Sequence, residues 1–105
     1  MGHCVRMILP RHETNENERN RIIAAIVKRH GGVTTWDGEG WWDSPKAGLV
    51  LEPIQIIECS LSEWDQSAST WWSELTERAR CELEQERIFY TVRPESILTP
   101  EGTIT

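Results

Sequence analysis

Hydrophobic residues recur along the chain with two different periods, and each period predicts one kind of element. Apolar side chains at every second position, as in the run from Val5 to Leu9, predict strands. Isoleucines at helical spacing after Asn15 predict a helix that Gly31 ends through a left-handed cap, and a stripe through Trp72 predicts a second helix. The expected elements are strands at 3–9, 33–36, 49–59 and 87–93 and helices at 15–30 and 65–86.

This order of elements predicts a ferredoxin-like α+β fold, β-α-β-β-α-β. Two helices would cover one face of a four-stranded antiparallel sheet, with the first and third strands in its centre. We expect a single domain over 1–93 and a C-terminal tail over 94–105, a polar segment that contains Pro94 and Pro100. The second face of the sheet has no helix to cover it, so we expect function there.

The segment 36–52 contains three of the six tryptophans of the chain, Trp36, Trp41 and Trp42, among glycines and acids. Pro53 cannot donate a ladder hydrogen bond, which predicts that residues 49–52 belong to a protruding hairpin and residues 54–59 to the sheet proper. Neighbouring strand residues face opposite ways, so at least one of Trp41 and Trp42 is expected to be accessible. Tryptophan is a common anchor of protein interfaces.

The uncovered face should carry one alternation set from each strand. That set mixes apolar with polar side chains, and exposed patches of this kind mark interfaces. A homodimer face or a partner-binding face is one interpretation, and cover by the tail or by the folded-back hairpin is the other. The expected residues are Cys4, Arg6, Ile8, Thr34, Trp36, some of Gln55, Ile57 and Cys59, and Phe89 and Thr91.

The charge of the chain excludes several classes of function. A net charge of −6 disfavours contact with a phosphate backbone, so no direct nucleic-acid binding is expected. No apolar run approaches the ~20 residues of a membrane span, and the N-terminal residues do not resemble a signal peptide. No membrane association is therefore expected. Three cysteines without framework spacing indicate reduced thiols and a cytoplasmic protein.

Catalytic and metal-binding patterns are also missing from the sequence. The histidines and cysteines show no metal-ligand spacing, and no glycine loop could cradle a phosphate, so no metal and no cofactor are expected. Cys59 and Cys81 lie in patterned elements and are expected to be small buried residues. The sequence therefore favours a binding role over an enzymatic one.

Four short motifs carry a resemblance. They are Gly32-Val33-Thr34, the segment from Asp37 to Trp42, Glu52-Pro53 before the third strand, and Leu83-Glu84-Gln85-Glu86 before the fourth. With these motifs the chain, over about 5–93, resembles a group of short uncharacterised bacterial and phage proteins of ferredoxin-like build. The resemblance implies the fold and carries no activity.

The leading hypothesis is a non-enzymatic binding or regulatory protein, such as a small acidic inhibitor that phages or mobile elements direct against host nucleases or defence complexes. Its partner-binding residues would be Trp36, Trp41 and Trp42 in the hairpin and Arg6 and Phe89 on the uncovered face. The alternative is a dimeric α+β barrel that binds a small molecule or acts as an enzyme. That alternative needs a polar group inside the barrel, and Arg6 or Glu58 could supply it.

Overall fold

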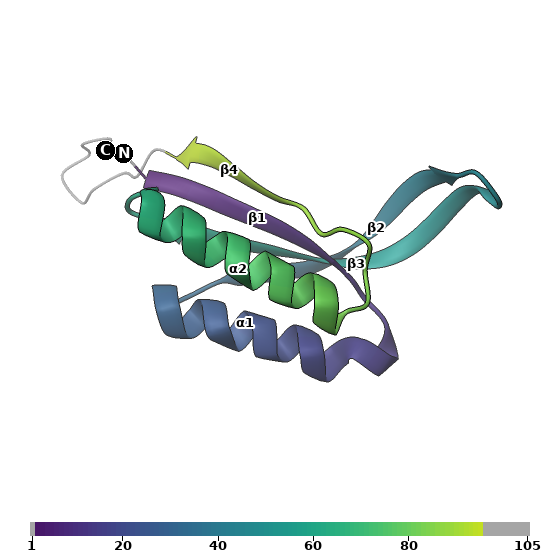
Figure 1. Ribbon diagram of the computed structural model, residues 1–105, viewed down its shortest axis with the longest axis horizontal. Helices are drawn as coiled ribbons and strands as arrows, with labels where there is room; N and C mark the ends of the chain where they lie inside the picture. Colours follow the sequence, from purple (N-terminus) through teal and green to yellow (C-terminus); the bar gives the residue numbers. More distant parts are fainter. Residues whose placement is uncertain (1, 96–105) are drawn as a thin grey trace.

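The computed structural model of the chain describes residues 2–95 and confirms the ferredoxin-like α+β fold (Figure 1). Every neighbouring pair of strands is antiparallel, and the order across the sheet is β2-β3-β1-β4, which places β1 and β3 in the centre as expected. The elements are β1 (Gly2–Pro10), a 3-10 turn (Glu13–Asn15), α1 (Glu16–His30), β2 (Thr34–Ser44), β3 (Gly48–Leu61), α2 (Gln66–Glu82) and β4 (Tyr90–Glu95).

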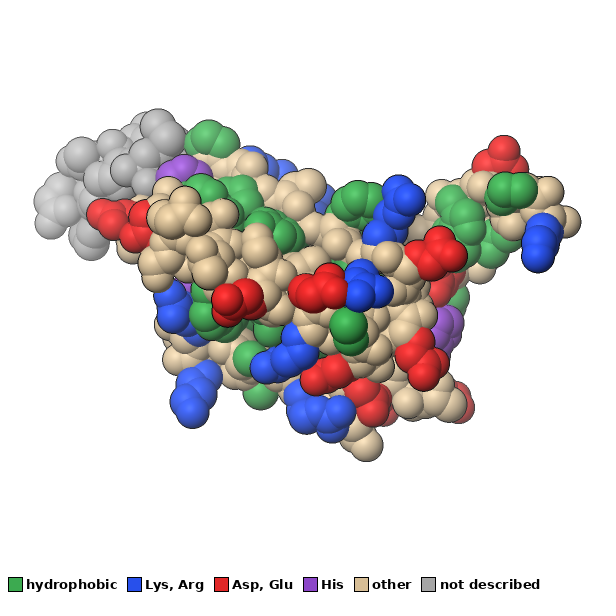
Figure 2. All heavy atoms as spheres, viewed as in Figure 1, with side chains coloured by type: hydrophobic (Ala, Val, Ile, Leu, Met, Phe, Trp, Pro, Cys, Tyr) green, Lys and Arg blue, Asp and Glu red, His purple; other side chains and the backbone are tan. Residues whose placement is uncertain are grey.

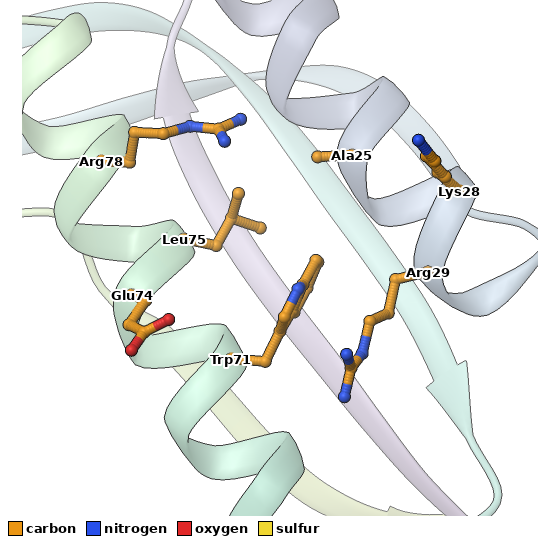
Figure 3. A pocket seen from close by; sticks show the side chains of 7 residues that line it. All are labelled: Ala25, Lys28, Arg29, Trp71, Glu74, Leu75 and Arg78. Carbon is orange, nitrogen blue, oxygen red and sulfur yellow. The ribbon is translucent and has the colours of Figure 1, made fainter.

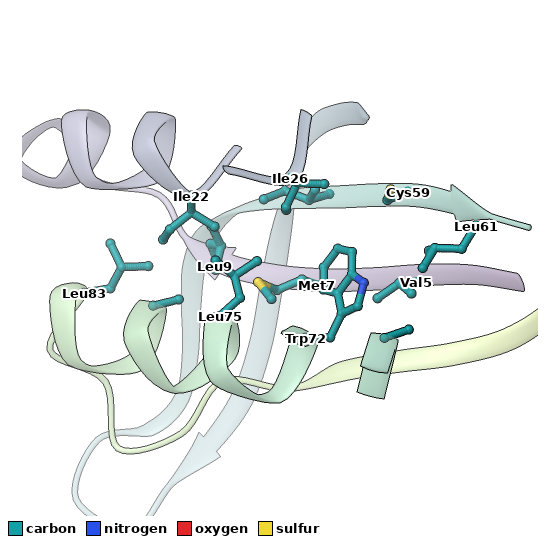
Figure 4. Close-up of a cluster of buried hydrophobic side chains, with 13 residues drawn as sticks. Val5, Met7, Leu9, Ile22, Ile26, Cys59, Leu61, Trp72, Leu75 and Leu83 are labelled. Carbon is teal, nitrogen blue, oxygen red and sulfur yellow. The ribbon is translucent and has the colours of Figure 1, made fainter. Parts of the chain in front are cut away.

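Both helices pack on one face of the sheet and enclose the core (Figures 1 and 4). The inward alternation set of β1 is fully buried, as the pattern predicted, and Trp72 of α2 is the largest fully buried side chain. Burial of such apolar area is the main stabilising contribution to a domain of this size. The core consists of Val5, Met7, Leu9, Ile22, Ile26, Ile57, Cys59, Leu61, Ala68, Trp72, Leu75, Ala79 and Leu83.

The caps explain where the helices begin and end. Gly31 has a φ of 90° and donates its N–H to the Val27 carbonyl, which ends α1 as predicted. Asp65 accepts from the Ala68 N–H at 2.8 Å and starts α2. Helix α2 ends at Glu82, earlier than the expected 86, because Glu84 adopts a left-handed φ of 54°.

The last strand begins and ends later than the pattern indicated. It was expected over 87–93 and is observed over Tyr90–Glu95. Its pairing with β1 continues to Gly2, which lies opposite Glu95, so the strand runs two residues beyond the expected domain boundary. The rest of the expected tail, 96–105, lies outside the described residues. No helix within 2–95 combines the length and apolar character needed to cross a membrane.

Strands β2 and β3 extend beyond the rest of the sheet as a two-stranded arm, defined here as residues 39–53 (Figures 1 and 2). The protruding hairpin was predicted, although β2 is much longer than the expected 33–36. The Pro53 carbonyl accepts from the Arg11 N–H at 2.9 Å, so Pro53 faces the side of β3 on which β1 lies. The nitrogen of Pro53 points to that same side, just past the end of β1. The missing N–H of proline therefore removes no hydrogen bond of the sheet. The arm gives the molecule its extents of 53 × 24 × 24 Å.

Candidate functional site

The face of the sheet opposite the helices, called here the open face, carries the candidate site. Paired residues of neighbouring strands share a face, so the register assigns its members. Arg6 lies opposite Glu58 of β3 and Thr91 of β4, and Trp36 lies opposite Ile56. The open face therefore includes the predicted residues of β1, β2 and β4, among them Arg6, Thr91 and Trp36.

The expectation for β3 was wrong. Gln55, Ile57 and Cys59 face the helix side, where Ile57 and Cys59 are buried in the core. Isoleucine occupies positions 54, 56 and 57, so both alternation sets of β3 are apolar and the pattern alone does not select a face. The open face takes Ile54, Ile56, Glu58 and Ser60 instead.

Glu58 forms the centre of a charged cluster on the open face. Its Oε1 accepts from Arg6 Nε at 2.8 Å and from Arg93 Nη2 at 3.3 Å. Both arginines thus approach the same oxygen, and among the described residues no donor is bonded to Oε2. The Arg6 guanidinium also lies 5.7 Å from the centre of the Trp36 ring, a cation–π distance. Sequence reasoning had named Arg6 and Trp36 but gave Arg93 no role, because the pairing of β1 with β4 was needed to bring it to Glu58.

A hollow of about 420 Å³ adjoins this cluster. Two carboxylates, Glu58 and Glu95, line it together with the thiol of Cys4 and the hydroxyls of Thr34 and Ser60. Burial raises the pKa of the Cys4 thiol, and the charges of Glu58 and Glu95 raise it further, against a smaller opposing effect of Arg93. Cys4 therefore stays protonated at neutral pH.

Apolar side chains surround the cluster. Ile8 and Trp36 are exposed, and Phe89, which lies just before β4 rather than within it, is 66% exposed. The glycines of β2 make room here: a Cβ on Gly38 would lie 3.3 Å from the Ile56 side chain. Bulky side chains of β3 therefore lie across β2 and continue the apolar surface toward the arm.

The arm is apolar on both faces. Trp42 pairs with Val50 on the side of the open face, whereas Trp41 pairs with Leu51 on the other side. Trp41 is 57% exposed and Trp42 is also exposed, so both are accessible where at least one was expected. Trp36 lies opposite Ile56 in the body of the sheet, so it belongs to the open face and not to the arm.

Neither metal-ligand clusters nor activated thiols occur in the described part of the chain. Within 2–95 no three His, Cys, Asp or Glu side chains come together as a metal site would require. Burial raises the pKa of the Cys59 thiol to about 11, as befits a core residue. Cys81, expected to be buried, is exposed near the end of α2, where the apolar stripe turns away from it.

A small ferredoxin-like protein with an uncovered sheet face is the class that these features define. No protein-family model and no curated protein matches the sequence. Among solved structures, a phage SAM lyase in complex with S-methyl-5'-thioadenosine is 18% identical, with a TM-score of 0.65 over 98% of this chain and 84% of that one. The apo state of a phage SAM lyase is 17% identical, with a TM-score of 0.62 over 99% and 84% of the two chains.

A second kind of neighbour is the CutA protein. Pyrococcus horikoshii CutA, solved in the presence of 3 M guanidine hydrochloride, is 10% identical with a TM-score of 0.56 over 94% of this chain and 89% of that one. The periplasmic divalent cation tolerance protein CutA of Archaeoglobus fulgidus is 12% identical with the same score, over 96% and 90%. At these identities the likeness shows the fold alone, and it confirms the resemblance to small phage and bacterial proteins at that level.

Proposed function

We propose that the open face binds a small cationic nucleoside, an adenosyl sulfonium of the S-adenosylmethionine type. The observation that carries the proposal is the central Glu58 carboxylate, held by Arg6 and Arg93 next to the exposed ring of Trp36. This arrangement develops the alternative hypothesis from the sequence, in which Arg6 or Glu58 supplies the polar group of a small-molecule site.

The chemistry of the ligand matches the cluster group by group. The free Oε2 of Glu58, with Glu95 across the hollow, suits the sulfonium or the ammonium cation. The N–H groups of Arg6 and Arg93 that do not contact Glu58 suit the amino-acid carboxylate, since charge-assisted hydrogen bonds are stronger than neutral ones. The Trp36 ring offers a flat apolar surface for adenine.

The fold supports this choice of ligand. The phage SAM lyase is similar in fold to 98% of this chain, and the molecule bound to that lyase is an adenosyl thioether. A 105-residue chain with an exposed apolar margin around the site has a reason to self-associate, because a second copy would remove that margin from water. We place the assembly in the cytoplasm, where the free thiols at Cys4, Cys59 and Cys81 persist.

Isothermal titration with S-adenosylmethionine and with the neutral S-methyl-5'-thioadenosine tests the proposal. Glu58→Gln keeps the shape of the side chain and removes its charge, and loss of a charge-assisted contact should weaken S-adenosylmethionine about tenfold. The thioether, which has no cation, should lose much less. Glu39→Gln, an exposed acid on the arm, is the matched control and should bind as the wild type does.

Two results would overturn the proposal. One is a wild type that binds neither molecule at millimolar concentration, and the other is a Glu58→Gln variant that loses both equally. Glu58 is about one-fifth exposed and its arginines more so, so little stability should be lost, and circular dichroism verifies this. Chromatography of the incubated mixture, compared with a protein-free control, then asks whether S-methyl-5'-thioadenosine is released together with homoserine lactone. The lactone forms when the substrate's own carboxylate displaces the thioether, which would make the protein a lyase, whereas homoserine would indicate hydrolysis.

The exposed arm favours a second candidate function, the binding or inhibition of another protein. Trp41, Leu49 and Leu51 form an apolar cluster on the arm face away from the open face. Rigid aromatic anchors of this kind suit a protein partner, such as a host nuclease or defence complex targeted by a phage. Pull-down from a host lysate with wild type and Trp41→Ala is the test, and identical recovery with both would count against this function.

A further inference from the structure

A groove of about 510 Å³ lies between α1 and α2, on the layer away from the open face. Figure 3 shows Trp71 and Leu75 reaching into it from α2, with Arg78 extending across toward α1. From α1 come Ala25, Lys28 and Arg29. A volume of this size lies within the usual range for small-ligand sites.

Trp71 provides a fixed aromatic wall in the groove. Its ring meets those of Trp72 and His30 edge-on, at centroid distances of 5.2 and 5.3 Å. The Arg29 guanidinium lies 5.3 Å from the Trp71 ring centre and donates to Ser67 Oγ at 3.4 Å. The Arg29 guanidinium therefore lies over the Trp71 ring, in a cation–π contact, and Ser67 helps to position it.

Positive charge gathers here against the trend of the chain, whose net charge is −6. Three cations line the groove with one acid, Glu74. Among the described residues no carboxylate lies within 4.0 Å of Lys28 or Arg29, and Arg78 has Glu82 at 3.6 Å. The dipole of α1 accounts for Lys28 and Arg29 in its last turn. Arg78 lies just before the last turn of α2 and pairs with Glu82, and its side chain extends across the groove toward α1 (Figure 3).

We propose that this groove binds a nucleoside phosphate. Its phosphate groups would lie among Lys28, Arg29 and Arg78, and its base against Trp71. Guanidinium groups hold phosphate oxygens through paired hydrogen bonds, and an indole ring offers a stacking surface for any base. The groove and the open face lie on opposite sides of the sheet, so this site is independent of the function proposed above.

Titration of the intact chain with ADP, adenosine and inorganic pyrophosphate tests the site by calorimetry and by phosphorus NMR. ADP should bind most tightly, pyrophosphate more weakly and adenosine least, and added salt should weaken ADP because the attraction is between charges. Removing the Arg78 charge in Arg78→Gln should weaken ADP about tenfold. Arg21→Gln is the matched control, since Arg21 is an exposed α1 arginine paired with Glu18 at 3.6 Å and does not line the groove.

The outcomes separate a site from general charge attraction. Loss of ADP affinity in Arg78→Gln but not in Arg21→Gln supports the groove. Equal losses in both variants, or no ADP binding at millimolar concentration in the wild type, would overturn it. Competition by S-adenosylmethionine against ADP would also overturn it, because the two ligands would then share one site.

Discussion

Trp72 is the side chain on which the fold should depend most strongly. It is the largest fully buried residue and lies between the rings of His30, stacked at 5.6 Å, and Tyr90 at 6.4 Å. Replacing a buried tryptophan with alanine removes its transfer energy and leaves a cavity, which together cost on the order of 3–5 kcal/mol. A domain of this length has roughly 5–15 kcal/mol of unfolding free energy, so Trp72→Ala should bring it close to instability.

Urea denaturation followed by far-ultraviolet circular dichroism measures this loss without relying on tryptophan fluorescence. With a slope of about 1–3 kcal/mol/M, a loss of about 3–5 kcal/mol should lower the midpoint by roughly 1–5 M. Trp72→Phe should lose less, because it keeps a ring and removes an indole N–H that has no partner among the described residues. Trp41→Ala is the control: at 57% exposure it should change stability by only about 0.5 kcal/mol in dilute protein.

The reasoning would be refuted if Trp41→Ala lost as much as Trp72→Ala at every protein concentration. A loss in Trp41→Ala that appears only in concentrated protein has a different meaning. Self-association stabilises the folded state by mass action, so such a result would place the arm in a contact between copies. The same titration thus tests the core and the arm separately.

Three further predictions follow from single residues. Light scattering should show a wild-type mass above 12.1 kDa and a lower mass for Phe89→Glu, because a buried unpaired charge opposes association; equal masses would exclude Phe89 from the interface. Burial and the neighbouring Arg29 lower the pKa of His30, so the free energy of unfolding should fall as pH drops below about 6.5 and level off below the pKa of the folded state. A His30→Phe variant should lack this pH dependence, and a variant that keeps it would show that another group causes it. Gly31→Ala should lower the free energy of unfolding by about 1–2 kcal/mol because Gly31 has a φ of 90°, whereas Gly32→Ala should be nearly neutral. Equal melting temperatures of the two variants would contradict the role of Gly31 as the left-handed cap of α1.

The fold could be predicted because its strongest signals are local. The strict alternation from Val5 to Leu9 and the glycine after α1 both correspond to observed features. Strand β2 was underestimated because Gly38 and Gly40 suggested a break, whereas in the sheet they make room for isoleucines of β3. Helix α2 was overestimated because Leu83 continues the apolar stripe and no glycine marks the turn that Glu84 makes.

The candidate site depended on contacts between distant strands, which explains why it was only partly predicted. Arg6 and Trp36 could be placed from alternation within their own strands. Glu58 could not, because both faces of β3 are apolar nearby, and Arg93 reaches it over 35 residues of sequence. Pairing register, rather than composition, brings these groups together.

The two-layer architecture also determines where this chain can meet a ligand. The core side of the sheet is filled by side chains from both helices, so ligands are left with the open face and the outer surface of the helices. The open face carries Glu58 and Glu95 at a hollow, with Arg6 and Arg93 bonded to Glu58. The helix groove carries Lys28, Arg29 and Arg78 together with Glu74. The two proposals therefore assign different ligands to opposite layers: an adenosyl sulfonium to the open face and a nucleoside phosphate to the helix groove, where its phosphates meet a surplus of cations.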